Sequence, residues 1–82
     1  MSVRPEWLPE AISDLANAPD WRFAEAAAVA VRRYATDGIG FVLRVPVSDG
    51  PDEFRLLIPR LRTYLRVRRG ANVLYVERVI FR

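Results

Sequence analysis

The sequence contains no cysteine, no histidine and no lysine. The absence of cysteine excludes disulfide bonds and thiolate metal sites. The absence of histidine removes both the usual zinc ligand and the usual acid–base group at neutral pH. No glycine-rich phosphate loop, carboxylate cluster with metal-ligand spacing or nucleophile–base pair is visible either. We therefore expect neither a metal nor a cofactor.

Long apolar stretches are also missing. No run approaches the roughly 18–20 apolar residues of a membrane span, and the first ten residues have neither the charge order nor the apolar stretch of a signal peptide. We therefore expect a cytoplasmic protein with no membrane contact. The length of 82 residues allows one domain, residues 1–82, and the hydrophobic content of 51% is sufficient for a core.

All the basic charge is carried by arginine, and it is unevenly distributed. Residues 1–40 hold four arginines against six acidic residues, whereas residues 41–82 hold nine arginines against four. The planar guanidinium group of arginine pairs with phosphates and stacks on bases. A basic half on a small domain is typical of a contact surface for nucleic acid or for an acidic protein partner.

The first half of the chain predicts two helices. "PEAISDLANA" places Pro9 at a first helical position, where its missing N–H costs nothing. "DWRFAEAAAVAVRRYATDG" has Asp20 as its N-cap and Gly38 as its C-terminal signal. We expect these segments to form a helical hairpin, preceded by "SVRPEW", which its proline limits to an edge strand.

The second half changes to the period of two that is typical of strands. "GFVLRVP", "FRLLI", "RLRTYLRVR" and "NVLYVERVIFR" alternate in this way, and Pro59 interrupts the ladder after the second of them. We therefore predict an α+β fold in which the two-helix hairpin packs on one face of a three- to four-stranded antiparallel sheet.

The last two strands form a predicted hairpin. If Gly70–Ala71 is its tight turn, Arg66 faces Tyr75 and Tyr64 faces Glu77. The more apolar face, which should contact the helices, then carries Leu61, Thr63, Leu65, Val67, Leu74, Val76, Arg78 and Ile80. The opposite face carries Arg60, Arg62, Tyr64, Arg66, Arg68, Tyr75, Glu77, Val79 and Phe81.

Three interpretations of this arginine-rich face are open. The arginines neutralise phosphates while the aromatic rings stack on exposed bases, which makes a nucleic-acid-binding set of Arg60, Arg62, Tyr64, Arg66, Arg68, Tyr75 and Phe81. Alternatively the face docks an acidic peptide. In the third interpretation it is simply a solvated sheet face, with the tyrosines packed on arginines by cation–π contact and Glu77 in a salt bridge with Arg62 or Arg66.

The whole chain resembles the RelE/ParE toxin superfamily. "PEWLPEAISDLANAP" resembles the opening of these toxins, "FAEAAAVAVRRYATDG" their second helix, and "RTYLRVRRGANVLYVERVIFR" their closing hairpin. The resemblance implies the toxin of a type II toxin–antitoxin system, neutralised by a cognate antitoxin with an acidic, partly helical segment. RelE-like members cut mRNA in the ribosomal A site, whereas ParE-like members inhibit DNA gyrase and have no nuclease chemistry.

The resemblance also implies roles for individual residues. Arg62 or Arg66 would stabilise the phosphate, Arg82 would act as acid or phosphate clamp, and Glu77 is the candidate base. The sequence departs from the nuclease pattern, because Phe81 stands where a histidine is often found and a guanidinium is a poor base at neutral pH. The predicted function is that of a RelE-like, ribosome-dependent endoribonuclease that acts on mRNA through the basic sheet face. The alternatives are a ParE-like gyrase inhibitor and a catalytically silent interaction or inhibitor protein of the same fold.

Overall fold

The computed structural model describes residues 2–81. Within these residues two helices and a five-stranded sheet make up an α+β fold, which confirms the predicted class and the two helices. The strand order in the sheet is β1-β5-β4-β3-β2. In chain order the elements are β1 (Arg4–Trp7), α1 (Pro9–Ala16), α2 (Trp21–Asp37), β2 (Phe41–Val45), β3 (Glu53–Ile58), the 3-10 helix η1 (Pro59–Leu61), β4 (Thr63–Arg69) and β5 (Val73–Phe81).

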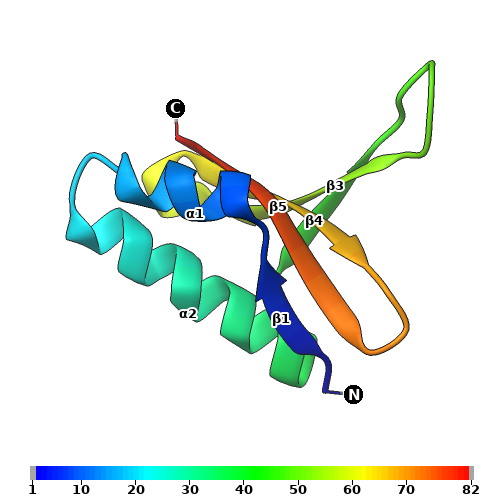
Figure 1. Ribbon diagram of the computed structural model, residues 1–82, viewed down its shortest axis with the longest axis horizontal. Coiled ribbons are helices and arrows are strands. Elements are labelled where there is room, and N and C mark those ends of the chain that lie inside the picture. Colours follow the sequence, from blue (N-terminus) through cyan, green and yellow to red (C-terminus); the bar gives the residue numbers. More distant parts are fainter. Residues whose placement is uncertain (1, 82) are drawn as a thin grey trace.

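The sheet is mixed, which differs from the prediction of three or four antiparallel strands. Strands β2 to β5 are consecutive and antiparallel, but β1 pairs in parallel with β5. The chain leaves β1, passes through both helices and three strands, and returns with β5 beside β1 in the same direction (Figure 1). No helix within residues 2–81 is both long and apolar enough to cross a membrane.

The helix boundaries follow the local sequence signals. Pro9 is the first residue of α1. The Asp20 side chain caps α2 by accepting a hydrogen bond from the Arg22 N–H at 2.8 Å. Gly38 ends α2 in the left-handed conformation, with a φ of 70°, and its N–H donates to the Tyr34 carbonyl. These signals succeed because each acts within one turn of the helix end.

Both helices lie on one side of the sheet (Figure 1). The small side chains of Ala27 and Ala35 are buried in α2 on either side of Val31, so this helix packs closely on the strands. The core comprises Val3, Ala11, Ala27, Val31, Ala35, Leu56, Leu65, Val67, Leu74, Val76 and Val79.

The register of the β4–β5 hairpin differs from the prediction in two ways. The Gly70 N–H donates to the Val73 carbonyl at 2.8 Å, so the two turn residues are Ala71–Asn72 instead of Gly70–Ala71. Arg69 consequently pairs with Leu74. This is a shift of two residues, and it leaves every side chain near the turn on its predicted face, because side chains in a strand alternate with a period of two.

A β-bulge then shifts the register by one more residue. Val67 pairs with Val76, but Arg66 pairs with Arg78, so Glu77 and Arg78 together oppose Arg66. A shift of one residue exchanges the two faces of β5 beyond the bulge. The predicted positions of Val79, Phe81, Arg78 and Ile80 are therefore wrong.

The bulge carries Val79 and Phe81 to the helix side of the sheet. Val79 is 3% exposed, and the Phe81 ring packs edge-to-face on Phe23 of α2 with 5.7 Å between centroids. Ile80 instead pairs with Tyr64 on the opposite face. Phe81 is a core-packing residue here and not a member of the arginine-rich face.

Arg60 and Arg62 were predicted to lie in the third long strand, but both lie outside the observed strand β4. Pro59 begins η1, which contains Arg60, and Arg62 follows it in the left-handed conformation with a φ of 51°. Strand β4 begins only at Thr63. The predicted row of four arginines is thus reduced to Arg66 and Arg68 within the strand.

Candidate functional site

The sheet face turned away from the helices is the candidate site, and we call it the outer face. The strand register assigns to it the residues Arg4, Glu6, Phe41, Leu43, Val45, Glu53, Arg55, Leu57, Tyr64, Arg66, Arg68, Val73, Tyr75, Glu77, Arg78 and Ile80. Five of the predicted site residues are on it together: Tyr64, Arg66, Arg68, Tyr75 and Glu77. Arg82 lies outside the described residues.

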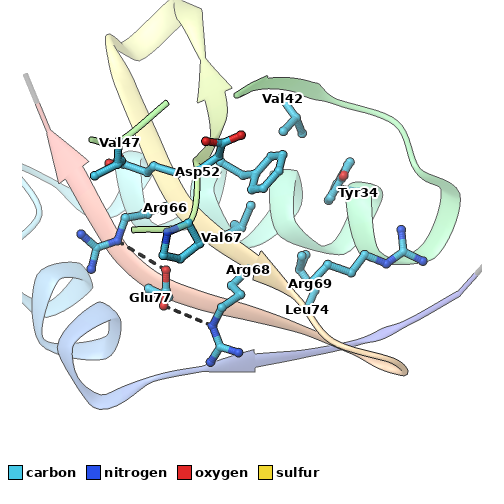
Figure 2. Close-up of a pocket in the computed structure, with 13 residues that line it drawn as sticks. Tyr34, Val42, Val47, Asp52, Arg66, Val67, Arg68, Arg69, Leu74 and Glu77 are labelled. Atoms are coloured by element: carbon cyan, nitrogen blue, oxygen red, sulfur yellow. Dashed lines mark hydrogen bonds and ion pairs between the residues drawn. The ribbon is translucent and has the colours of Figure 1, made fainter. Parts of the chain in front are cut away.

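Glu77 lies on the outer face between two arginines of the neighbouring strand β4. Its Oε1 lies 3.5 Å from Arg66 Nε, and its Oε2 lies 3.4 Å from Arg68 Nε (Figure 2). The Glu77 side chain is 27% exposed, whereas the arginines are 41% and 57% exposed. The carboxylate therefore holds both guanidinium groups in place while leaving them open to solvent. We call these three residues the Glu77 network.

Both tyrosines of the outer face are covered by arginines. The Arg55 guanidinium lies 4.6 Å from the centroid of the Tyr64 ring, and the Arg68 guanidinium lies 4.4 Å from that of Tyr75. The cation–π contacts that the sequence left open are thus present. A base that stacked on either ring would have to displace the guanidinium from that side.

Most arginines of the outer face have a carboxylate partner. Arg55 Nε donates to Glu53 Oε1 at 2.9 Å, a pairing that raises the pKa of Arg55. Arg78 pairs with Asp14. Glu77 shares the outer face with two further carboxylates, Glu6 and Glu53. The sequence offered a signal for the pair of Arg55 and Glu53, since the two residues are two apart in one strand and so share a face.

Arg78 reaches around β5 to helix α1. Its Nε and Nη2 donate to the two oxygens of Asp14 at 2.7 and 3.0 Å, and the Val79 N–H donates to the same carboxylate at 2.9 Å. The hydrogen bond from Arg78 lowers the pKa of Asp14, the Val79 N–H lowers it further, and burial opposes both. This site was missed in the sequence, because 64 residues separate the partners.

The Glu77 network forms part of the wall of a hollow of about 620 Å³ beside the β2–β3 connection (Figure 2). Apolar groups contribute most of the rest of the lining, among them Val47, Pro51 and Phe54. Fixed charges beside an apolar hollow suit a partner side chain that has both an apolar body and a polar end.

A second hollow joins the end of the outer face to η1. Arg55, Arg62 and Tyr64 line it together with Leu43 and Leu57. Arg60 and Arg62 are exposed, and no carboxylate within residues 2–81 lies in ion-pair distance of either. The predicted Arg62 is thus close to the outer face but separate from the Glu77 network. Residues 2–81 contain no group of three acidic side chains that could hold a metal ion.

No protein-family model, no curated protein and no solved structure matches this chain. The resemblance to the RelE/ParE superfamily therefore rests on the sequence motifs alone.

Proposed function

We propose that this chain is a RelE/ParE-like toxin domain that inhibits its target by contact. ParE-like members inhibit DNA gyrase without nuclease chemistry. The resemblance therefore implies DNA gyrase as the target of this chain. The observation that carries the proposal is the Glu77 network, in which one carboxylate orients two solvent-accessible guanidinium groups on the outer face. Groups oriented before binding lose little entropy when a partner docks.

The sign of the charges favours a protein surface as the partner. A nucleic acid presents a uniformly negative backbone, and proteins bind it with clustered positive charge. Here arginines alternate with carboxylates, because Arg55 pairs with Glu53 and both Arg66 and Arg68 pair with Glu77. A surface of alternating sign is complementary to a protein patch of the opposite pattern.

The geometry disfavours RNA cleavage at the Glu77 network. A general base must approach the proton that it removes within hydrogen-bond reach, and both oxygens of Glu77 already face guanidinium groups. The arginines themselves are poor bases. Phe81, at the position where nuclease members often have histidine, is packed on Phe23.

RelE-like cleavage of mRNA is the second candidate, and Arg62 is the observation that favours it. Arg62 is the single non-glycine residue with a positive φ within residues 2–81. Backbone conformations of this kind cost about 1–3 kcal/mol and cluster at functional sites. Arg62 lines one hollow with Arg55 and Tyr64, where two guanidinium groups would contact a phosphate.

Both candidate functions predict an antitoxin as a partner of this chain. Arg32 and Arg33 are exposed residues of the alanine-rich helix α2, and neither forms an ion pair within residues 2–81. An acidic, partly helical segment that lies along α2 and crosses to the outer face would neutralise these charges. Its affinity should fall with added salt.

The substitution Glu77→Gln tests the proposal. Induced expression in a bacterium without an antitoxin should arrest growth, and Glu77→Gln should retain the arrest, because the amide oxygen still accepts a hydrogen bond from one arginine and both guanidinium groups stay on the outer face. We expect the inducer concentration for half-maximal arrest to change by no more than about threefold, as for other exposed polar substitutions. Glu53→Gln is the matched control on the same face.

Two outcomes would contradict the proposal. A general base is worth about 100-fold or more in rate, so loss of the arrest in Glu77→Gln alone would indicate catalysis by that carboxylate. Harmless expression of the unaltered chain would instead favour a silent interaction protein.

A further inference from the structure

Strand β2 is an open edge of the sheet. Among residues 2–81 it pairs with β3 alone, so one side of its backbone has no partner strand in this part of the chain. The opposite edge is protected: β1 is four residues long and contains Pro5, and beyond β1 the Asp14 carboxylate accepts a hydrogen bond from the Val79 N–H. Proteins usually block both edges with such devices, because unpaired strands join other strands.

Exposed apolar side chains gather at the open edge. Phe41 is 70% exposed and Leu43 is 49% exposed, and both lie in β2 on the outer face. Five of the seven large apolar side chains that are exposed in residues 2–81 belong to β2, its flanks or the start of β3, namely Ile39, Phe41, Leu43, Val47 and Phe54. An exposed strand of this composition is expected to associate.

The charge at this edge indicates what kind of strand would bind there. Arg44 is the single charged residue of β2, and its Nε lies 3.0 Å from Asp52 Oδ2. The edge is therefore electrically neutral, so it gives an acidic peptide no advantage. An apolar, neutral strand fits best, and β2 is itself such a strand.

We infer that two copies of this chain pair antiparallel through β2, with the two-fold axis at Leu43. Leu43 then faces Leu43 of the second copy, and Phe41 faces Val45. All five residues of β2 are paired in this register, and Pro46, which has no N–H to donate, ends the ladder. Arg44 faces Val42, so the two arginines do not oppose each other.

The paired copies would form one continuous ten-stranded sheet. The two-fold axis is perpendicular to the sheet, so both pairs of helices lie on one side and both Glu77 networks on the other. The inference does not depend on the proposed function. Five residues per copy bury less than a standard interface of about 1,200–2,000 Å², so we expect half-association in the micromolar range.

Sedimentation velocity between about 1 and about 200 µM protein covers this range. The expected result is a shift from the monomer of 9.4 kDa to twice that mass. Leu43→Arg puts like charges opposite each other at the axis and should weaken association at least about 10-fold. Ile12→Arg on α1, where Ile12 is 55% exposed, is the matched control and should leave association unchanged.

The absence of cysteine allows a direct test of the register. Opposing residues in antiparallel strands have Cβ atoms about 4.5–5.5 Å apart, close to disulfide geometry. Leu43→Cys should therefore cross-link under mild oxidation at least about 10-fold faster than Phe41→Cys, although Phe41 is the more exposed residue. A chain that stays monomeric at every concentration would overturn the inference, and so would equal cross-linking rates in the two variants. Strand β2 would then be expected to pair with a strand of another protein.

Discussion

Replacing the partly buried Asp14 with alanine is expected to destabilise the fold more than any other substitution considered. The Asp14 carboxylate joins α1 to β5 by accepting three hydrogen bonds, two from Arg78 and one from the Val79 N–H. Removing it leaves the peptide N–H without its partner at the edge of the sheet. Hydrogen bonds to a charged group contribute about 1.5–3 kcal/mol, so we expect a loss of about 2 kcal/mol in the free energy of unfolding.

Thermal and urea unfolding would measure this loss. For a domain of this size, about 2 kcal/mol corresponds to a decrease in Tm of about 8–16 °C. Asp49→Ala is the matched control, because Asp49 is exposed in the β2–β3 connection and should change stability by less than about 0.5 kcal/mol. Equal losses in the two variants would show that the Asp14 contacts do not stabilise the fold.

The stability of the fold should depend on pH through the Asp14 carboxylate. Its pKa is held below the usual value of 3.8, chiefly by the hydrogen bond from Arg78. A lowered pKa in the folded state means that the contribution is fully present above the unfolded pKa of about 4 and is lost as the pH falls through the folded value. Asp14→Asn removes this titration, so its unfolding free energy should decline less steeply below about pH 4.

Reversing both charges of the Glu77 network should abolish inhibition. The double variant Arg66→Glu, Arg68→Glu puts three carboxylates, including Glu77, where the Glu77 network now has two guanidinium groups and one carboxylate. Like charges at a docking face cost several kcal/mol. We therefore expect the concentration for half-maximal inhibition of gyrase supercoiling to rise at least about 100-fold.

The control for this variant is Arg32→Glu, Arg33→Glu. These arginines are exposed on α2, on the other side of the sheet, and the charge of the chain changes by the same amount. Long-range attraction to the target is thereby matched. If both double variants lose inhibition equally, overall charge matters and the outer face does not.

The helices and the general architecture were predictable because their signals are local. Pro9, Asp20 and Gly38 each act on backbone groups within one turn, and the change of period after Gly38 separates helices from strands. The parallel pairing of β1 was not predictable, because nothing in four residues indicates which strand lies beside them.

The composition of the candidate site was predictable only in part, and the bulge explains why. The prediction continued a strict alternation through β5, but the consecutive charged residues Glu77 and Arg78 interrupt it, so the sequence offered a signal for the bulge that was missed. The bulge moves Phe81 off the outer face while Tyr64, Arg66 and Arg68 stay on it. The partnership of Arg78 with Asp14 depends on tertiary structure alone, since α1 and β5 are far apart in the chain.

Inhibition by contact is tested most directly by primer extension on a defined mRNA in a reconstituted translation reaction. A known nuclease toxin serves as the positive control, and the supercoiling assay with gyrase is run on the same protein preparation. Docking through the outer face predicts intact mRNA in a reaction where the control toxin cuts it, together with inhibited supercoiling. Discrete cuts at A-site codons that disappear with Arg62→Ala would contradict it and would make the arginines a catalytic site.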